Sequence, residues 1–251
     1  MRILILGGTT EASALARLLA NDARFEATLS LAGRTERPAP QPLPTRIGGF
    51  GGIDGLVRHL RDEKIAAVVD ATHPYADQMS KHAVAACDEA AVPLASLVRA
   101  PWTRQTGDEW HDAIDMAAAV EALGPEPRRV LLAIGRQELP LFAGAPQHRY
   151  LARVIDAPAG VALPPQLTLL QARGPFDLAA ETDLLRDHRI DLVVSKNAGG
   201  DATYAKIAAA RALGVPVVMI ARPDKPAGHV TATPEEAVAW LDHVRRSLRG
   251  V

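Results

Sequence analysis

The first twenty residues constrain the fold of this chain more than any other stretch. Residues 2–6 read Arg-Ile-Leu-Ile-Leu, a short apolar run typical of a strand buried on both faces of a parallel sheet. The turn Gly7-Gly8-Thr9-Thr10 follows, and residues 11–20 then carry Ala and Leu at helical spacing. A strand, a glycine turn and a helix in this order can bind phosphate, because glycines let backbone N–H groups approach an anion and the helix N-terminus favours negative charge.

The match to a dinucleotide-binding fingerprint is incomplete. The fingerprint places glycine at positions one, three and six of the loop, where this chain has Gly7, Thr9 and Ala12. The turn therefore favours nucleotide binding. A plain strand-to-helix turn, in which threonine hydroxyls cap the helix, is the alternative.

Composition narrows the class of protein. The 251 residues suggest one or two domains, and a net charge of −1 gives no bulk attraction to nucleic acid or membrane. We expect a soluble, cytoplasmic protein, because the sequence has neither a membrane-length apolar run nor a signal-peptide core. Cys87 is the only cysteine, which excludes an intramolecular disulfide and a cysteine-based zinc site, and we expect no metal.

The end of the second predicted strand bears on cofactor choice. Residues 27–32 read as a strand that ends at Gly33-Arg34-Thr35. In a dinucleotide fold this end faces the adenosine ribose, where an acid selects NAD and an arginine accommodates the 2′-phosphate of NADP. Arg34 therefore favours NADP(H); the alternative is that Arg34 is an ordinary exposed loop residue.

Polar side chains also follow the next strands. The stretch Asp70-Ala71-Thr72-His73-Pro74-Tyr75 follows a predicted strand over residues 65–70, and Arg99 follows another over 92–98. Ligands of open α/β sheets bind at the carboxyl ends of strands. His73 is therefore a candidate ligand contact or proton donor, although a histidine that orders its own loop is an equal alternative.

The pattern restarts after a polar stretch at residues 101–109. This predicts two Rossmann-like parallel-sheet domains of the α/β class, residues 1–100 and 101–251, with a cleft between them. Apolar runs predict further strands over residues 129–135, 150–155, 167–175, 191–194 and 215–220. Helical spacing predicts helices over residues 53–64, 76–90, 113–123, 177–188, 202–213 and from 233 onward.

A second glycine turn carries its own polar cluster. Ser195-Lys196-Asn197-Ala198-Gly199-Gly200 follows the strand at 191–194, as the first glycine turn follows the first strand. Each side chain alone is typical of an ordinary surface residue, but the cluster favours a site for an anionic substrate. The candidate side chains are those of Ser195, Lys196, Asn197, Tyr204, Lys206 and Arg222.

Three blocks of sequence resemble the precorrin-6A reductase family of cobalamin biosynthesis. They are residues 5–12, residues 70–76, and residues 195–200 together with 203–207. The blocks stand in the family's order and span nearly the whole chain, while residues 100–175 carry less of the resemblance.

The resemblance implies an NAD(P)H-dependent reduction of one double bond in precorrin-6A, giving precorrin-6B. That tetrapyrrole carries acetate and propionate carboxylates, which suits Arg and Lys at strand ends. A cobalt-precorrin-6A reductase that uses NADH is the alternative, against which Arg34 favours NADPH and the metal-free substrate. A non-catalytic NADP sensor is a further alternative, although a sensor has no need of the second glycine cluster.

The resemblance also implies residue roles. The cofactor would contact Gly7, Gly8, Thr9, Thr10, Glu11, Arg34, Thr35, Thr72 and His73. The substrate would contact Tyr75, Arg99, Ser195, Lys196, Asn197, Gly199, Gly200, Tyr204, Lys206 and Arg222. The proton would come from His73, Tyr75, Lys206 or water, and the residues leave that choice open.

The spacing of the tyrosines argues against another class of nicotinamide enzyme. A short-chain reductase or epimerase would place Lys four residues after an active-site Tyr, but Met79 follows Tyr75 and Ala208 follows Tyr204 at that spacing. We expect a small-molecule tetrapyrrole as substrate, no nucleic acid, no membrane, and transient contact with neighbouring pathway enzymes.

Overall fold

The structure is a computed structural model that describes residues 1–33, 35, 38–226 and 228–250. The chain divides into two compact units, Met1–Ala100 with Pro223–Val251 (unit 1) and Pro101–Arg222 (unit 2). Each unit contains one six-stranded sheet whose paired strands all run parallel. The predicted α/β class with two parallel-sheet domains is confirmed.

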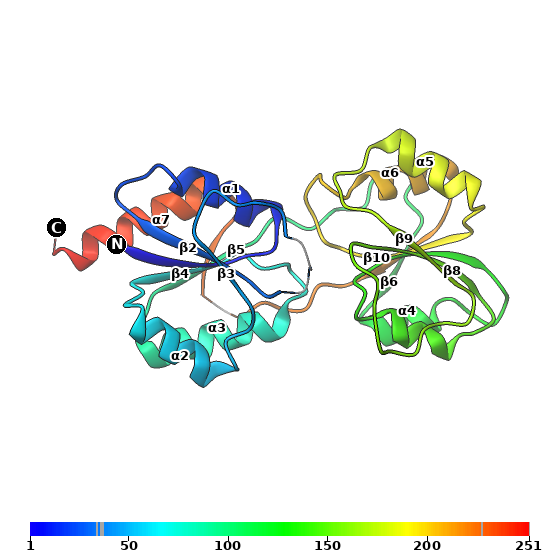
Figure 1. Ribbon diagram of the computed structural model, residues 1–251. Helices are drawn as coiled ribbons and strands as arrows, with labels where there is room; N and C mark the ends of the chain where they lie inside the picture. Colours follow the sequence, from blue (N-terminus) through cyan, green and yellow to red (C-terminus); the bar gives the residue numbers. More distant parts are fainter. Residues whose placement is uncertain (34, 36–37, 227, 251) are drawn as a thin grey trace. The chain divides into compact units, whose positions relative to one another are not determined.

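Unit 1 has the strand order β12-β5-β4-β1-β2-β3. Helices α1 and α7 cover one face of this sheet and helices α2 and α3 cover the other (Figure 1). Its strands are β1 (Arg2–Leu6), β2 (Glu26–Leu31), β3 (Thr45–Ile47), β4 (Ala67–Asp70), β5 (Leu94–Leu97) and β12 (His229–Thr231). Its helices are α1 (Thr10–Leu19), α2 (Ile53–Asp62), α3 (Asp77–Ala90) and α7 (Pro234–Leu248).

Unit 2 has the strand order β6-β11-β10-β7-β8-β9. Helices α5 and α6 cover one face, and α4, which contacts the 3-10 helix η1, lies on the other (Figure 1). Its strands are β6 (Trp110–Ala113), β7 (Arg129–Ala133), β8 (Arg149–Val154), β9 (Leu167–Gln171), β10 (Leu192–Lys196) and β11 (Val217–Ile220). Its helices are α4 (Met116–Glu121), η1 (Leu139–Gly144), α5 (Leu178–Asp187) and α6 (Ala205–Leu213).

The chain crosses between the units twice, and each crossing leads into an edge strand. It leaves unit 1 after β5 and forms β6, which pairs with β11. It leaves unit 2 after β11 and forms β12, which pairs with β5. The expected C-terminal domain over residues 101–251 is therefore wrong at its end, because Pro223–Val251 belongs to unit 1. The helix expected over 113–123 begins only at Met116, because Trp110–Ala113 form β6.

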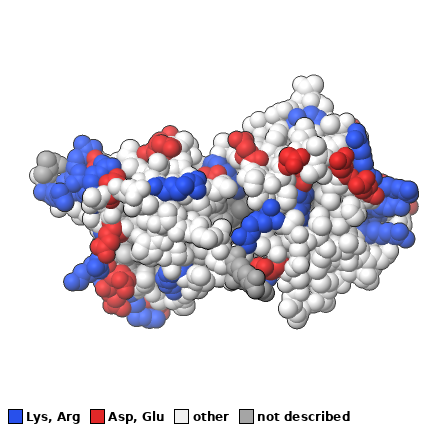
Figure 2. All heavy atoms as spheres, turned by 45° about the horizontal axis from the view of Figure 1, so that its top comes forward, with Lys and Arg blue, Asp and Glu red and all other residues white. Residues whose placement is uncertain are grey.

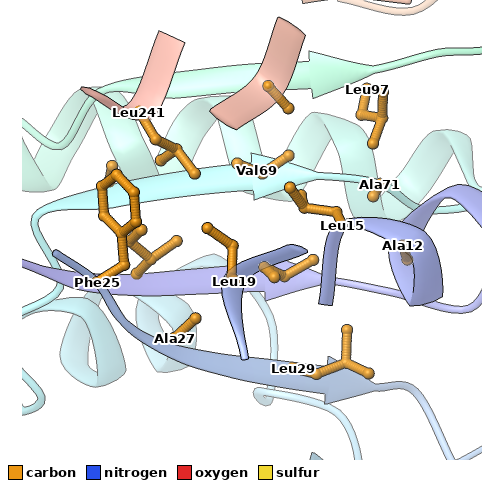
Figure 3. Close-up of a cluster of buried hydrophobic side chains, with 14 of the residues drawn as sticks. Ala12, Leu15, Leu19, Phe25, Ala27, Leu29, Val69, Ala71, Leu97 and Leu241 are labelled. Atoms are coloured by element: carbon orange, nitrogen blue, oxygen red, sulfur yellow. The ribbon is translucent and has the colours of Figure 1, made fainter. Parts of the chain in front are cut away.

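Packing explains why the last segment belongs to unit 1. The Thr233 hydroxyl caps α7 by accepting from the Glu236 N–H at 3.2 Å, as its sequence predicts. Leu241 of α7 then lies over the sheet in one apolar cluster with side chains of α1 and of strands β2, β4 and β5 (Figure 3). This cluster buries the helix–sheet face that the first hundred residues alone would expose to water.

Candidate functional site

The first glycine turn, Gly7-Gly8-Thr9-Thr10, lies where β1 ends and α1 begins. The Thr9 hydroxyl accepts from the Ala12 N–H at 3.1 Å and donates to the Ala71 carbonyl at 2.8 Å. It therefore caps α1, which is one of the two roles that the sequence left open for the threonine hydroxyls, and it fastens the turn to the end of the neighbouring strand β4. Gly8 has a φ of +124°, which favours glycine, and no other atom lies within 4 Å of the position that its Cβ would take. The backbone at Gly8 is therefore not covered by side chains on the side where a Cβ would lie.

A small surface hollow lies beside this turn. It is lined by Thr9, Glu11, Thr72, Pro74, Leu97, Val98 and Arg99.

Glu11 and Arg99 form an ion pair at the edge of the hollow. The Arg99 guanidinium lies 2.6 Å from Glu11 Oε2, which also accepts from the Thr10 hydroxyl at 3.1 Å. Glu11 stands in the first turn of α1, where the helix dipole stabilises a negative charge. Arg99, which we expected on the substrate side, lies in unit 1 beside the first glycine turn.

Asp70 is a buried hub at the end of β4. Its carboxylate is 0% exposed and accepts from the Thr72 N–H at 3.0 Å, the Thr72 hydroxyl at 2.6 Å, the Ser80 hydroxyl at 2.6 Å and Lys225 Nζ at 3.0 Å. Burial opposes ionisation, but the Lys225 ammonium and these hydroxyl donors outweigh it and hold the pKa of Asp70 below its usual range. Thr72 is thus oriented by Asp70, and neither Asp70 nor Lys225 was among the predicted site residues.

His73 and Tyr75 lie together in the turn that follows. The Tyr75 N–H donates to His73 Nδ1 at 3.3 Å, and the ring centroids are 5.7 Å apart. His73 therefore orders its own loop, which was the alternative interpretation of this residue. Of the residues predicted near the adenosine, Thr35 is half-buried after Gly33, and Arg34 lies outside the described residues.

Arg46 holds a further glycine-rich turn, residues 48–52, which follows β3. Arg46 of β3 donates to the carbonyls of Gly48 at 2.5 Å and Gly49 at 2.6 Å, and its guanidinium lies 3.8 Å from the centre of the Phe50 ring. It also donates to the Ser30 hydroxyl at 3.3 Å. The sequence did not indicate Arg46, because β3 is too short to be recognised as a strand.

In unit 2, Lys196 ends β10 and forms an ion pair with Glu138. Glu138 stands in the turn after β7, the strand beside β10. A Cβ at Gly135 would lie 2.6 Å from Glu138 Oε2, so glycine at this position leaves room for the Glu138 carboxylate. Glu138 was missed because it lies 58 residues from Lys196 in the sequence.

The predicted cluster around the second glycine turn is brought together. Asn197 exchanges two hydrogen bonds with the backbone of Trp102, and Gly199 and Gly200 both have a φ of +69°. Arg222 donates to the carbonyls of Asn197 at 2.7 Å and Ala198 at 2.9 Å. Arg222 thus supports the turn from the last residue of unit 2.

Three other predicted side chains already have structural partners. Ser195 is 0% exposed and donates to the Lys196 carbonyl at 3.1 Å. The Tyr204 hydroxyl accepts from Arg211. Lys206 Nζ donates to the Thr203 carbonyl at 2.7 Å and lies 4.7 Å from the centre of the Trp102 ring.

The surface charges are mixed in sign. Figure 2 shows Lys and Arg side chains interspersed with Asp and Glu over the face in view. Within the ranges that the structure describes, no helix is both long and apolar enough to span a bilayer. In the same ranges, His, Cys, Asp and Glu side chains do not gather in groups of three or more that could hold a metal.

Comparison with known proteins gives full-length matches. A precorrin-6A reductase of Rhodobacter capsulatus is 54% identical to this chain over 250 residues, covering 100% of this chain and 99% of that protein. A solved structure of CobK precorrin-6A reductase superposes with a TM-score of 0.93 at 54% identity and covers 97% of each chain. A cobalt-precorrin-6A reductase of Salmonella typhimurium is 30% identical over 234 residues, covering 88% of this chain and 87% of that protein.

The match to a protein family extends over residues 2–242 and so includes both units and both glycine turns. On this match and the resemblance along its full length, the chain belongs to the precorrin-6x reductase family CbiJ/CobK.

Proposed function

We propose that this chain reduces precorrin-6A with NADPH to give precorrin-6B. The observation that carries the proposal is the 54% identity to a precorrin-6A reductase along the whole chain. The cobalt-precorrin-6A relative stands at 30%, which favours the metal-free substrate over the cobalt-containing one.

The cofactor is assigned to unit 1. The open backbone at Gly8 and the capped N-terminus of α1 suit the pyrophosphate. The Arg99 guanidinium would neutralise Glu11 and face the same anion, so we move Arg99 from the substrate side to the cofactor side. NADPH supplies the hydride, and Thr72, held by Asp70, is placed near its nicotinamide end.

The 2′-phosphate of NADPH is assigned to Arg34, with Thr35 beside it. This assignment comes from the sequence, because Arg34 follows β2, the strand whose end faces the adenosine ribose in dinucleotide folds.

The macrocycle is assigned to the carboxyl edge of the unit 2 sheet. Basic residues follow four of its strands there: Arg136 after β7, Arg173 after β9, Lys196 at the end of β10 and Arg222 after β11. Guanidinium and ammonium groups at a shared edge suit a substrate that carries several carboxylates. Asn197, Gly199 and Gly200 lie in the turn beside them, and we assign Tyr204 and Lys206 at the start of α6 to the same substrate. The proton that completes the reduction comes from His73, Tyr75, Lys206 or water.

The proposal is tested by mixing the purified protein with NADPH and following absorbance at the nicotinamide band. We expect oxidation of NADPH only when precorrin-6A is present. Turnover with cobalt-precorrin-6A and NADH, but not with precorrin-6A, would overturn the proposal in favour of the cobalt branch.

Two variants test the residue assignments in the same assay. Arg34→Ala should raise the Kd for NADPH about tenfold or more and leave that for NADH within about twofold, because a charge-assisted contact to one phosphate is lost. Equal losses for both nucleotides would remove Arg34 from the 2′-phosphate. Lys196→Ala should raise the KM for precorrin-6A, and an unchanged KM would remove Lys196 from the substrate edge.

A further inference from the structure

Trp102 contacts much of the second glycine cluster, although it lies outside the family blocks and 95 residues before Asn197. Its N–H donates to Asn197 Oδ1 at 2.8 Å, and its carbonyl accepts from Asn197 Nδ2 at 3.0 Å. Its indole Nε1–H donates to the Gly200 carbonyl at 2.8 Å. One residue thus holds both ends of the turn 197–200.

The indole ring also reaches the start of α6. Lys206 Nζ lies 4.7 Å from the ring centroid, a distance that favours a cation–π contact. The Tyr204 ring lies at 5.6 Å between centroids with a tilt of 56°. The Trp102 ring therefore contacts both residues at the start of α6 that are assigned to the substrate.

We infer that Trp102 is a positioning residue for the substrate. It fixes the turn 197–200 and the Tyr204–Lys206 segment in the shape that receives the macrocycle, although it stands on the segment that enters unit 2. The inference rests on the proposed function, which assigns these residues to the macrocycle.

The contacts of Trp102 separate into two kinds. The bonds to Asn197 use the backbone of Trp102 and survive any replacement of its side chain. The contacts to Gly200, Lys206 and Tyr204 use the indole and do not. Side-chain variants therefore loosen one end of the turn while the other end stays held, which makes a folded protein with an altered turn the expected result.

The test compares Trp102→Phe and Trp102→Ala in the full chain. Phe keeps a ring beside Lys206 and Tyr204 but loses the bond to the Gly200 carbonyl, so we expect the KM for precorrin-6A to rise about threefold. Ala loses the ring as well, and we expect a rise of about tenfold or more. The KM for NADPH should stay within about twofold in both variants, because the cofactor is assigned to unit 1.

Two controls separate positioning from general stability. Trp240→Phe alters a tryptophan of unit 1 that stacks on His229 with ring centroids 5.7 Å apart, and it should leave both KM values unchanged. Leu185→Ala removes a buried side chain from the same unit 2 core and should lower the Tm without the selective rise in KM.

The outcomes are distinct. An unchanged KM for precorrin-6A in folded Trp102→Ala, or in folded Trp102→Phe if the alanine variant does not fold, overturns the inference. An equal rise for both substrates, or a rise that Leu185→Ala reproduces, also overturns it. If Lys196→Ala raises the KM while the Trp102 variants do not, only the inference fails; if neither has any effect, the substrate edge itself is wrongly assigned.

Discussion

The ion pair between Glu11 and Arg99 places a carboxylate beside the turn that we assign to a pyrophosphate. Alone, that carboxylate would repel the incoming anion. Paired with Arg99 at 2.6 Å it is neutralised, and the dipole at the N-terminus of α1 still favours negative charge. The ion pair therefore removes the repulsion that Glu11 alone would exert, and Glu11 in turn holds the Arg99 guanidinium beside the turn.

This arrangement predicts the effect of removing Arg99. Arg99→Met should raise the Kd for NADPH about tenfold, because Glu11 is left unpaired near the pyrophosphate. Adding Glu11→Gln to that variant should return the Kd to within about threefold of the starting value. Isothermal titration with NADPH measures both.

The control uses an exposed arginine of the same unit. Arg61 pairs with Glu89 at 3.5 Å, with side chains 57% and 54% exposed, and Arg61→Met should leave NADPH binding unchanged. If Arg99→Met instead raises the KM for precorrin-6A and leaves NADPH binding intact, Arg99 belongs to the substrate, as the sequence first indicated.

At the level of single residues, the sequence predicts local interactions and misses distant ones. The cap by Thr9 and the cap by Thr233 each involve a residue three positions away, so a short motif carries them. The partners Lys225 and Asp70 lie 155 residues apart, and no local pattern connects them. The positions of Lys196 and Asn197 at a strand end were predicted, but not the glutamate and tryptophan that orient them.

Among the elements, the segment that returns from unit 2 to β12 is fixed to the end of β4 by one buried ion pair. Lys225, whose side chain is 14% exposed, lies 3.0 Å from the fully buried carboxylate of Asp70. Breaking such a pair leaves an uncompensated buried charge, which costs more than an exposed pair contributes.

Lys225→Met should therefore lower the free energy of unfolding at pH 7 by about 3 kcal/mol. The matched control is Lys81→Met, which removes an exposed pair with Asp77 on α3 and should change it by less than about 0.5 kcal/mol. Urea unfolding followed by circular dichroism measures both, and equal effects would refute the role of Lys225.

The same pair predicts a dependence on pH. The pKa of Asp70 is lowered in the folded protein, while in the unfolded chain it is about 3.9. The stabilising contribution of its ionised form is therefore complete above that unfolded value and is lost as pH falls through the folded pKa. Asp70→Asn should flatten this part of the acid limb of the unfolding curve.

The sequence predicts the interior strands of both sheets, because their apolar runs are buried on both faces. Of the four edge strands among the described residues it predicts β9 and misses β3, β6 and β12. β3 and β12 have three residues each, and in β6 only Trp110 and Ala113 are buried, so these strands lack an apolar run. An edge strand is defined by its neighbour in the sheet, and that neighbour is not encoded locally.

On the scale of the whole molecule, the two units differ in continuity. Unit 2 is one stretch, Pro101–Arg222, whereas unit 1 needs both ends of the chain. The functional split between a cofactor unit and a substrate unit stays a proposal, and the cleft expected between them stays a prediction.

Continuity predicts how fragments behave. Residues 101–222 expressed alone should unfold cooperatively on heating, because their sheet and core are complete. Residues 1–100 alone should not unfold cooperatively, because two contacts are missing. The apolar face that Leu241 covers is exposed, and the edge of β5 that pairs with β12 is unpaired. Joining 1–100 to 223–251 through a flexible Gly/Ser linker should restore a cooperative transition, as measured by circular dichroism. Cooperative unfolding of 1–100 by itself would contradict this division.

The placement of β12 and α7 also orders events during synthesis. The first glycine turn is made before unit 2, yet β12 and α7, which complete its unit, are made after unit 2. Proteins usually acquire their structure from the N-terminal end onward. Here we expect unit 2 to fold earlier, because unit 1 stays incomplete until residues 223–251 have been made.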